Sequence, residues 1–180
     1  ERMLPAALDM GLAPRAILEI FMQVGLYAGF VTTEASAALA HALFKERIII
    51  VPEDAVPTRS AEDLDRLGEA VMSKLHGDRS RQGYAAADNA ITGALYPSAI
   101  RYGYGDLWSR AGLDHRGRML CALAAFTAMG LESQLAKFAR SALNVGLGRE
   151  EIVEAVIQTA PYGGFPRALN GLGILSEALK

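Results

Sequence analysis

The sequence predicts an all-α fold, and three observations support this prediction. Several stretches place apolar residues at helical spacing, and glycine or proline stands where each stretch would end. A helix–break–helix segment occurs twice along the chain. The single β-branched run, Arg47 to Val51 (RIIIV), cannot form a sheet on its own.

The repeated segment runs from Gly11 to Phe30 and again from Gly146 to Phe165, at a fixed offset of 135 residues. Eight of the twenty aligned positions are identical, where chance would give roughly one. We therefore expect an internal duplication of one helical unit. The shared positions include core residues and polar residues, among them the pair Glu19 and Glu154.

The second copy of the unit is the more complete one. Leu135, Phe138 and Ala142 fall on one helical face, and Gly146 stands where a helix C-cap glycine belongs. Pro166 is suited to the first turn of a final helix. The predicted helices cover residues 116–129, 132–145, 149 to about 160, and 166–178.

The first copy opens inside the unit. Residues 15–24 form its expected helix, 27–29 form the break, and 2–9 align with 137–144. Its first helices are missing, so either the protein extends upstream or those residues were lost, and we favour upstream extension because the first residue is Glu.

Between the copies, residues 52–60 are predicted to be a linker, 61–75 a helix and 77–90 a loop. Residues 91–108 are predicted to be helical in their central part, with interruptions near Pro97 and Gly103. The predicted organisation is a partial first unit (1–45), a linker with a helix (46–90) and a second unit (91–180).

Composition excludes several classes of function. The 180 residues are 51% apolar and 21% charged with a net charge of −2, so a nucleic-acid partner is not expected. No apolar run approaches the roughly 20 residues needed to span a bilayer, and a membrane partner is not expected either. The single cysteine, Cys121, is typical of a reducing compartment, so we expect a cytoplasmic protein. His41, His76 and His115 show no metal-ligand spacing.

Three motifs resemble the carboxymuconolactone decarboxylase family of the alkylhydroperoxidase-D-like superfamily. They are Tyr104 to Asp114 (YGDLWSRAGLD), Ala142 to Glu154 (ALNVGLGREEIVE) and Tyr162 to Asn170 (YGGFPRALN). The resemblance covers residues 102–180 well and 1–43 as a partial second unit, so the chain is similar to a two-unit member.

The resemblance implies packed helical hairpins assembled as trimers or hexamers, with a two-unit chain forming a trimer that mimics a hexamer. It also implies one of two activities. These are cofactor-independent decarboxylation of γ-carboxymuconolactone in aromatic catabolism, and thiol peroxidase activity.

The sequence disfavours the peroxidase. The cysteine positions of the superfamily's CxxC fall on Leu131 and Gln134, the histidine position on Phe138, and the assisting glutamate near Met119. A peroxidatic thiolate needs a lowered pKa and a resolving partner, and Cys121 is expected to be a core residue. Decarboxylase-type units also commonly carry the histidine that Phe138 replaces, which indicates an altered pocket, a different substrate or a structural unit.

Decarboxylation of an unsaturated lactone requires groups that hold carboxylates, stabilise a dienolate and return a proton. Arg110 and Arg118 are candidates for gripping a carboxylate. Alternatively, Arg118 joins helices by pairing with an acid such as Glu154.

Glu154 and its repeat partner Glu19 lie on mainly apolar helices, where burial would raise a carboxyl pKa and suit a proton donor. A structural ion pair is an equally open interpretation. Tyr162 and Tyr27 precede a glycine break, where a hydroxyl can donate to an oxyanion in a cavity or simply pack locally.

We therefore assign catalysis to Glu154, Tyr162 and Arg118, and substrate binding to Arg110, Trp108, Phe138, Tyr104 and Pro166. His115 follows the N-cap residue Asp114 and is expected to be exposed. The leading hypothesis is a lyase that needs no metal or organic cofactor and acts on a small carboxylated lactone or related acid. The alternative is a non-catalytic member that binds a ligand or serves assembly, and self-association is expected in both cases.

Overall fold

The computed structural model describes residues 3–52, 58–82 and 89–180, and within these ranges it is all-α with no strand. The prediction of an all-α fold is confirmed. The first half contains α1 (Met3–Asp9), α2 (Pro14–Ala28), α3 (Phe30–Glu46), α4 (Ala61–His76) and the short 3₁₀-helix η1 (Gly77–Arg81).

The second half begins with one continuous helical stretch made of α5 (Tyr96–Ser98), the π-helix η3 (Ala99–Asp106) and the 3₁₀-helix η4 (Leu107–Ser109). Its remaining helices are α6 (His115–Met129), α7 (Glu132–Asn144), α8 (Arg149–Ile157), α9 (Ala160–Gly163) and α10 (Phe165–Ala178).

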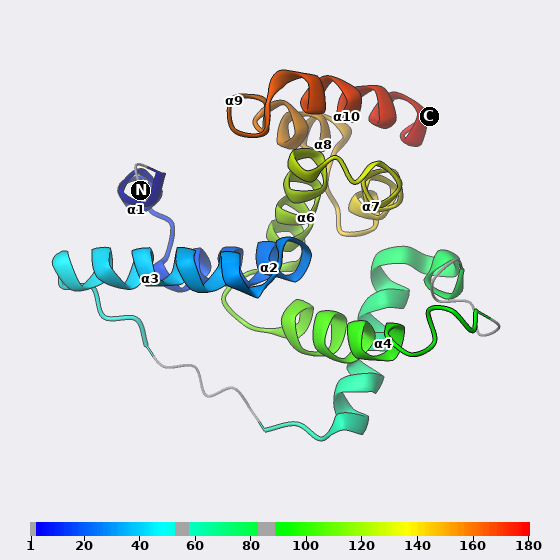
Figure 1. Ribbon diagram of the computed structural model, residues 1–180, viewed down its shortest axis with the longest axis horizontal. Helices are drawn as coiled ribbons and strands as arrows, with labels where there is room; N and C mark the ends of the chain where they lie inside the picture. The colour runs from blue at the N-terminus through cyan, green and yellow to red at the C-terminus, as the bar shows by residue number, and fades with distance from the viewer. Residues whose placement is uncertain (1–2, 53–57, 83–88) are drawn as a thin grey trace.

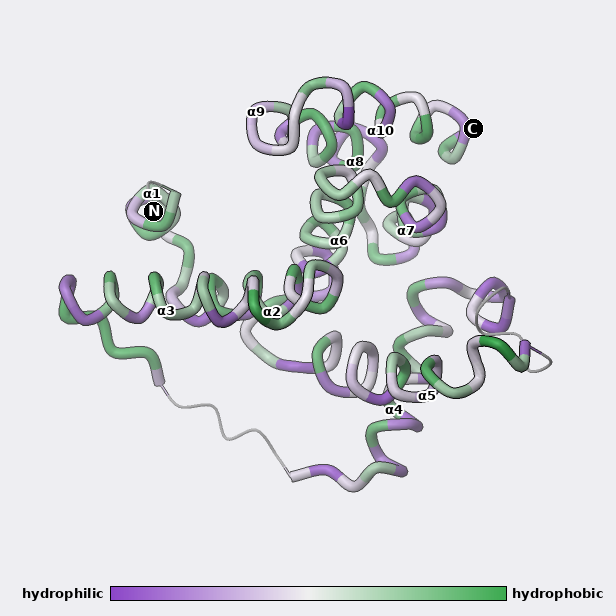
Figure 2. Tube along the Cα trace, in the orientation of Figure 1, coloured by the Kyte–Doolittle hydropathy of each residue, from purple (hydrophilic) through white to green (hydrophobic). Residues whose placement is uncertain are grey.

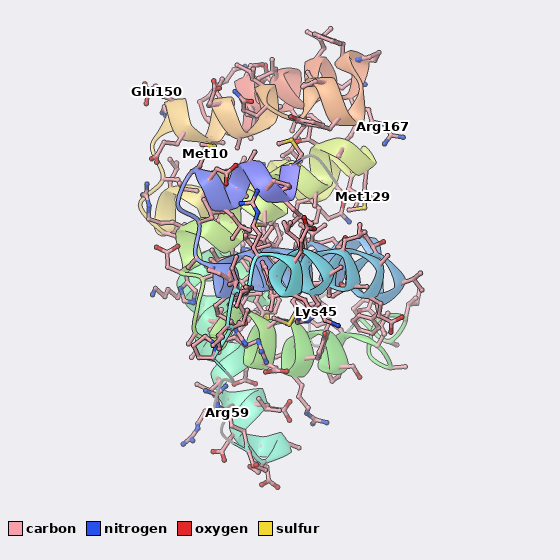
Figure 3. The ribbon with its side chains drawn as sticks, turned by 90° about the vertical axis from the view of Figure 1, so that its left-hand side faces the viewer. Met10, Lys45, Arg59, Met129, Glu150 and Arg167 are labelled. Atoms are coloured by element: carbon pink, nitrogen blue, oxygen red, sulfur yellow. The ribbon has the colours of Figure 1, made fainter. Side chains whose placement is uncertain are left out.

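The helices lie in layers around α6. Figures 1 and 3 show α8 and α10 at one end of the molecule, α2 and α3 across its middle, and η3 with α4 at the other end. Helix α6 contacts α2, α7, α8 and α10. Figure 2 shows that α6 is hydrophobic along most of its length, which suits a helix that is covered on several sides.

Local sequence signals fix the ends of α6. The Asp114 carboxylate accepts a hydrogen bond from the Gly117 amide at 2.8 Å, which caps the N-terminus. Gly130 ends the helix in the left-handed conformation, with φ of +71°. The buried side chains of Leu123, Phe126 and Leu135 join α6 to α7 in the main core.

The two repeated segments have the same helix–glycine–helix form. Gly29 joins α2 to α3 with φ of +95° and ψ of 154°, and Gly164 joins α9 to α10 with φ of +95° and ψ of 139°. These positive φ values suit glycine. The predicted break at residues 27–29 is therefore a one-residue corner in which α2 continues as far as Ala28.

The predicted interruptions near Pro97 and Gly103 were wrong. Pro97 lies in the first turn of α5, where its missing N–H costs no helical hydrogen bond, and Gly103 lies inside η3. Glycines serve close packing here instead. A Cβ on Gly105 would come within 2.1 Å of the Leu64 carbonyl oxygen, and one on Gly68 within 2.5 Å of the Ile100 carbonyl oxygen.

The segment between the units contributes to the helical body. Its predicted helix is α4, which packs on η3 and α7. The run at residues 47–51 forms a turn, with Ile48 at φ of +56°. The predicted loop at 77–90 begins as η1, and its residues 83–88 lie outside the described part of the chain, as do residues 53–57 of the predicted linker. Among the described helices, none is both long and apolar enough to cross a bilayer.

Candidate functional site

A cavity of about 520 Å³ lies between α2, the η3–η4 stretch, α6 and α7. Its walls are mainly aromatic and aliphatic. They include Leu26, Tyr27, Tyr96, Gly103, Tyr104, Trp108, Phe126, Leu131, Gln134, Lys137 and Phe138. A pocket of this size with a few polar groups is typical of a small-molecule site.

Lys137 places an ammonium group in this wall. It is half-buried on α7, and burial together with the nearby Arg79 guanidinium lowers the pKa of its ammonium group. An ammonium in an apolar cavity is suited to bind a carboxylate. Ser133 and Gln134, one turn earlier on the same helix, add polar groups to the same wall.

A buried arginine lies behind Tyr27. Arg118 Nη1 donates to Gln23 Oε1 at 3.1 Å, and Gln23 Nε2 donates to the Tyr27 hydroxyl oxygen at 3.0 Å. Arg118 and Gln23 are both fully buried. Burial raises the pKa of Tyr27 well above its usual value, so this hydroxyl stays protonated at neutral pH.

A second hydrogen-bond chain lies behind Tyr104. Its hydroxyl is 3.0 Å from Nε2 of His76, whose Nδ1 is 2.7 Å from Ser141 Oγ. Arg79 Nη2 donates to the same Ser141 oxygen at 3.1 Å. Burial, with help from the charges of Lys137 and Arg79, lowers the pKa of His76 to about 3, so the imidazole is neutral.

His76 is a residue of the site that sequence reasoning missed. It is 1% exposed, and its ring packs edge-on against Phe138 with 4.9 Å between centroids. An imidazole from α4 thus lies beside the position where the family commonly carries a histidine. The available signal was spacing, since His76 follows Met72 by four residues on the buried face of α4.

The arginines predicted to bind substrate do not line the cavity, because they hold Glu19. The Glu19 carboxylate is fully buried and accepts from Arg118 Nη2 at 2.9 Å, Arg110 Nε at 3.1 Å and Arg15 Nη2 at 2.7 Å. These contacts join α2 to α6 and to the segment after η4. The structural interpretation of Arg118 as a helix-joining residue describes this position, but its partner is Glu19 and not Glu154.

The second copy of the repeat has the opposite environment. Glu154 is exposed and accepts from Gln158 Nε2 at 2.5 Å, so the expectation that its helix buries it was wrong. Tyr162 is 70% exposed. Pro166 is exposed in the first turn of α10. None of these three residues lines the cavity.

Of the residues predicted to bind substrate, Tyr104, Trp108 and Phe138 come together in the cavity wall. Trp108 is 1% exposed, and its indole Nε1 has no hydrogen-bond partner within the described chain. His115 is only partly exposed, which corrects the expectation, and its Nε2 donates to the Trp108 carbonyl at 3.2 Å.

The superfamily's thiol positions also fall on the cavity. Leu131 and Gln134 both line it, so apolar and amide side chains occupy the place of a CxxC. The only cysteine of the chain, Cys121, is partly exposed on α6, yet burial of its thiol raises the pKa to about 11. A thiol with a raised pKa is a poor peroxidatic nucleophile. No cluster of three or more His, Cys, Asp or Glu side chains in residues 3–52, 58–82 and 89–180 could hold a metal ion.

Within the described residues, the fold is all-α and encloses a largely aromatic cavity. Residues 94–177 match the carboxymuconolactone decarboxylase family. A domain of this family implies the alkylhydroperoxidase-D-like fold, which the sequence motifs also predicted.

Three relatives match this part of the chain. A 4-carboxymuconolactone decarboxylase of Acinetobacter baylyi is 30% identical over 80 residues, which is 44% of this chain and 60% of the relative. A nitrosuccinic acid decarboxylase of Metarhizium robertsii is 30% identical over 78 residues, 43% of this chain and 54% of the relative. An uncharacterised 15.0 kDa protein of Paracoccus denitrificans is 36% identical over 73 residues, which is 39% of this chain and 54% of the relative. The matched segments thus span between 54% and 60% of the relatives' own lengths.

Proposed function

We propose that the protein is a carboxy-lyase that decarboxylates a small unsaturated carboxylated lactone or a related acid, without a metal or organic cofactor. The observation that carries the proposal is the apolar cavity, lined mostly by residues of the segment that matches the family, with the ammonium group of Lys137 in its wall. Two of the relatives are named as decarboxylases of small acids, which supports the same class of reaction.

The cavity suits the chemistry in two ways. Lys137 would bind a carboxylate of the substrate, and the aromatic surface formed by Trp108, Phe126 and Phe138 would surround the carboxylate that leaves. An apolar surrounding disfavours the charged carboxylate relative to neutral CO2. The electron pair left behind becomes a dienolate, which needs hydrogen-bond donors and then a proton.

Removing the cavity ammonium tests this function. We expect Lys137→Met to lower kcat/KM for γ-carboxymuconolactone at least about tenfold, because a charge-assisted hydrogen bond is lost. Lys137→Arg should retain much of the activity, and Lys45→Met, on the exposed surface of α3 (Figure 3), should leave it unchanged. Ultraviolet-monitored turnover measures all three, and equal activity in the wild type and Lys137→Met would contradict the proposed carboxylate contact.

The alternative is a family member that binds a ligand or serves assembly without catalysis. Phe138 at the family's histidine position and the engagement of Arg110 and Arg118 by Glu19 favour this alternative. A folded protein that binds the lactone without converting it would establish it. A thiol peroxidase is disfavoured by the environment of Cys121.

We also propose that the chain is an internal duplication and that it self-associates, as a trimer that mimics a hexamer or as a hexamer. The matching corners at Gly29 and Gly164 support the duplication. Exposed apolar side chains next to both corners support association, since such surfaces are usually covered. They are Phe30, Val31, Ile157, Tyr162, Phe165 and Leu169.

A further inference from the structure

We propose that the Tyr27 hydroxyl and the indole N–H of Trp108 form an oxyanion subsite, in which both donate to a negatively charged oxygen of the ligand. This inference rests on the proposed function and deepens it, because the charged oxygen would be that of the dienolate. The subsite requires the Tyr27 hydroxyl to be a donor toward the cavity, and the hydrogen-bond chain behind it supplies that direction.

The direction of the Tyr27 chain is fixed by an arginine. Arg118 has only donors, so the Gln23 atom facing it must be the carbonyl oxygen. The Gln23 amide nitrogen then faces Tyr27 and donates to the hydroxyl oxygen. The hydroxyl proton of Tyr27 is left for another acceptor, and Tyr27 lines the cavity.

The Tyr104 chain has the opposite direction. Ser141 Oγ donates to the Lys137 carbonyl at 3.1 Å, so His76 Nδ1, 2.7 Å from the same oxygen, is the donor in that contact. The neutral imidazole has no second proton, so Nε2 accepts from the Tyr104 hydroxyl at 3.0 Å. This hydroxyl is therefore held by His76 and is not part of the subsite.

Trp108 is a second observation that indicates a ligand. Its indole N–H lies beside the Tyr27 hydroxyl oxygen and lowers the pKa of that group as a hydrogen-bond donor does, against the larger effect of burial. Nε1 of this fully buried residue has no partner of full hydrogen-bond geometry in the described ranges, where a buried indole N–H usually has one. A ligand oxygen placed beside the Tyr27 hydroxyl would accept from both donors.

The two donors belong to one wall region, since Tyr27 and Trp108 line the same cavity. Burial raises the pKa of Tyr27, so its hydroxyl remains a protonated donor at neutral pH. The ligand class is a planar, conjugated oxyanion such as an enolate or a phenolate, because aromatic side chains surround the donors.

The test uses 4-nitrophenol as a probe, because absorbance distinguishes its phenol and phenolate forms. We expect the full chain to lower the pKa of the bound probe. Tyr27→Phe should weaken phenolate binding about tenfold, the order expected for a hydrogen bond to a charged group, while binding of neutral phenol stays the same. Tyr102→Phe is the matched control, since Tyr102 lies on η3 but does not line the cavity.

Trp108→Phe provides a second route if Tyr27→Phe fails to fold. It removes the indole N–H and keeps an aromatic ring, so it should weaken phenolate binding while binding of neutral phenol stays the same. The proposal is overturned if 4-nitrophenol does not bind, if its pKa is unchanged on binding, or if phenolate binding is insensitive to both substitutions. Turnover of γ-carboxymuconolactone is measured separately, so phenolate binding without turnover retains the subsite and rejects the substrate.

Discussion

His76 shows how one buried residue connects stability to the candidate site. Its two ring nitrogens both have partners, Ser141 and Tyr104, and the ring is fully buried against Phe138. The guanidinium of Arg79 and the ammonium of Lys137 oppose its protonation, in addition to the larger effect of burial. Folding therefore selects the neutral imidazole that the Tyr104 contact requires.

The lowered pKa of His76 predicts that the protein loses stability in acid. The unfolded chain binds a proton at this residue below its ordinary pKa of 6.5, whereas the folded protein does so only near 3. Stability contributed by the neutral ring is complete above pH 6.5 and falls by up to about 1.4 kcal/mol per pH unit as the pH drops toward 3. Urea unfolding across this range should show a shallower dependence for His76→Gln than for the wild type. Identical slopes would contradict the neutral, buried state of His76.

At the scale of elements, α2 and α8 carry the same residues in opposite environments. Glu19 and Gln23 are buried under α6, whereas Glu154 and Gln158 face solvent and bond to each other. The difference comes from tertiary packing. Arg118 of α6 covers Glu19 on α2, whereas no helix of the described chain covers Glu154 on the equivalent face of α8.

This contrast predicts unequal effects from equivalent substitutions. Glu19→Gln should lower the free energy of unfolding by about 3–5 kcal/mol, because it leaves buried guanidinium groups without their carboxylate. Glu154→Gln, at the equivalent exposed position, should change it by less than about 0.5 kcal/mol. Chemical denaturation of both variants measures the difference. Equal losses of unfolding free energy would contradict the buried ion pairs of Glu19.

The same elements show what sequence could predict and what it could not. The N-terminus of α6 and the C-terminus of α7 followed from Asp114 and Gly146, which are local signals. Tyr104, Trp108 and Phe138 were expected near substrate and do line the cavity. The choice between Glu19 and Glu154 could not be made, because identical residues give no information on which copy is covered.

Other parts of the site depend on contacts between distant segments. His76 and Tyr104 are 28 residues apart, and His76 and Ser141 are 65 apart. No spacing rule brings such residues together. The continuous η3 stretch was also missed, because Gly103 and Gly105 look like helix breakers locally, and Gly105 is required by the close approach of α4.

For the whole molecule, the exposed apolar side chains at the two corners predict association in solution. Phe30 is 59% exposed and Phe165 is 69% exposed, at repeat-equivalent positions. We expect light scattering to give a mass of three or more chains, and Phe165→Glu to reduce it, because a charge in an apolar interface is costly. A mass of 19.2 kDa, that of one chain, would contradict the proposed assembly.

The most direct test of the proposed function compares the two repeat-equivalent tyrosines. Tyr27 lines the cavity, and Tyr162 lies on the surface with its hydroxyl toward Met3 Sδ at 3.6 Å. Turnover of γ-carboxymuconolactone should fall at least about tenfold in Tyr27→Phe and remain at the wild-type rate in Tyr162→Phe. Loss of turnover in Tyr162→Phe with full activity in Tyr27→Phe would contradict the assignment of the reaction to this cavity.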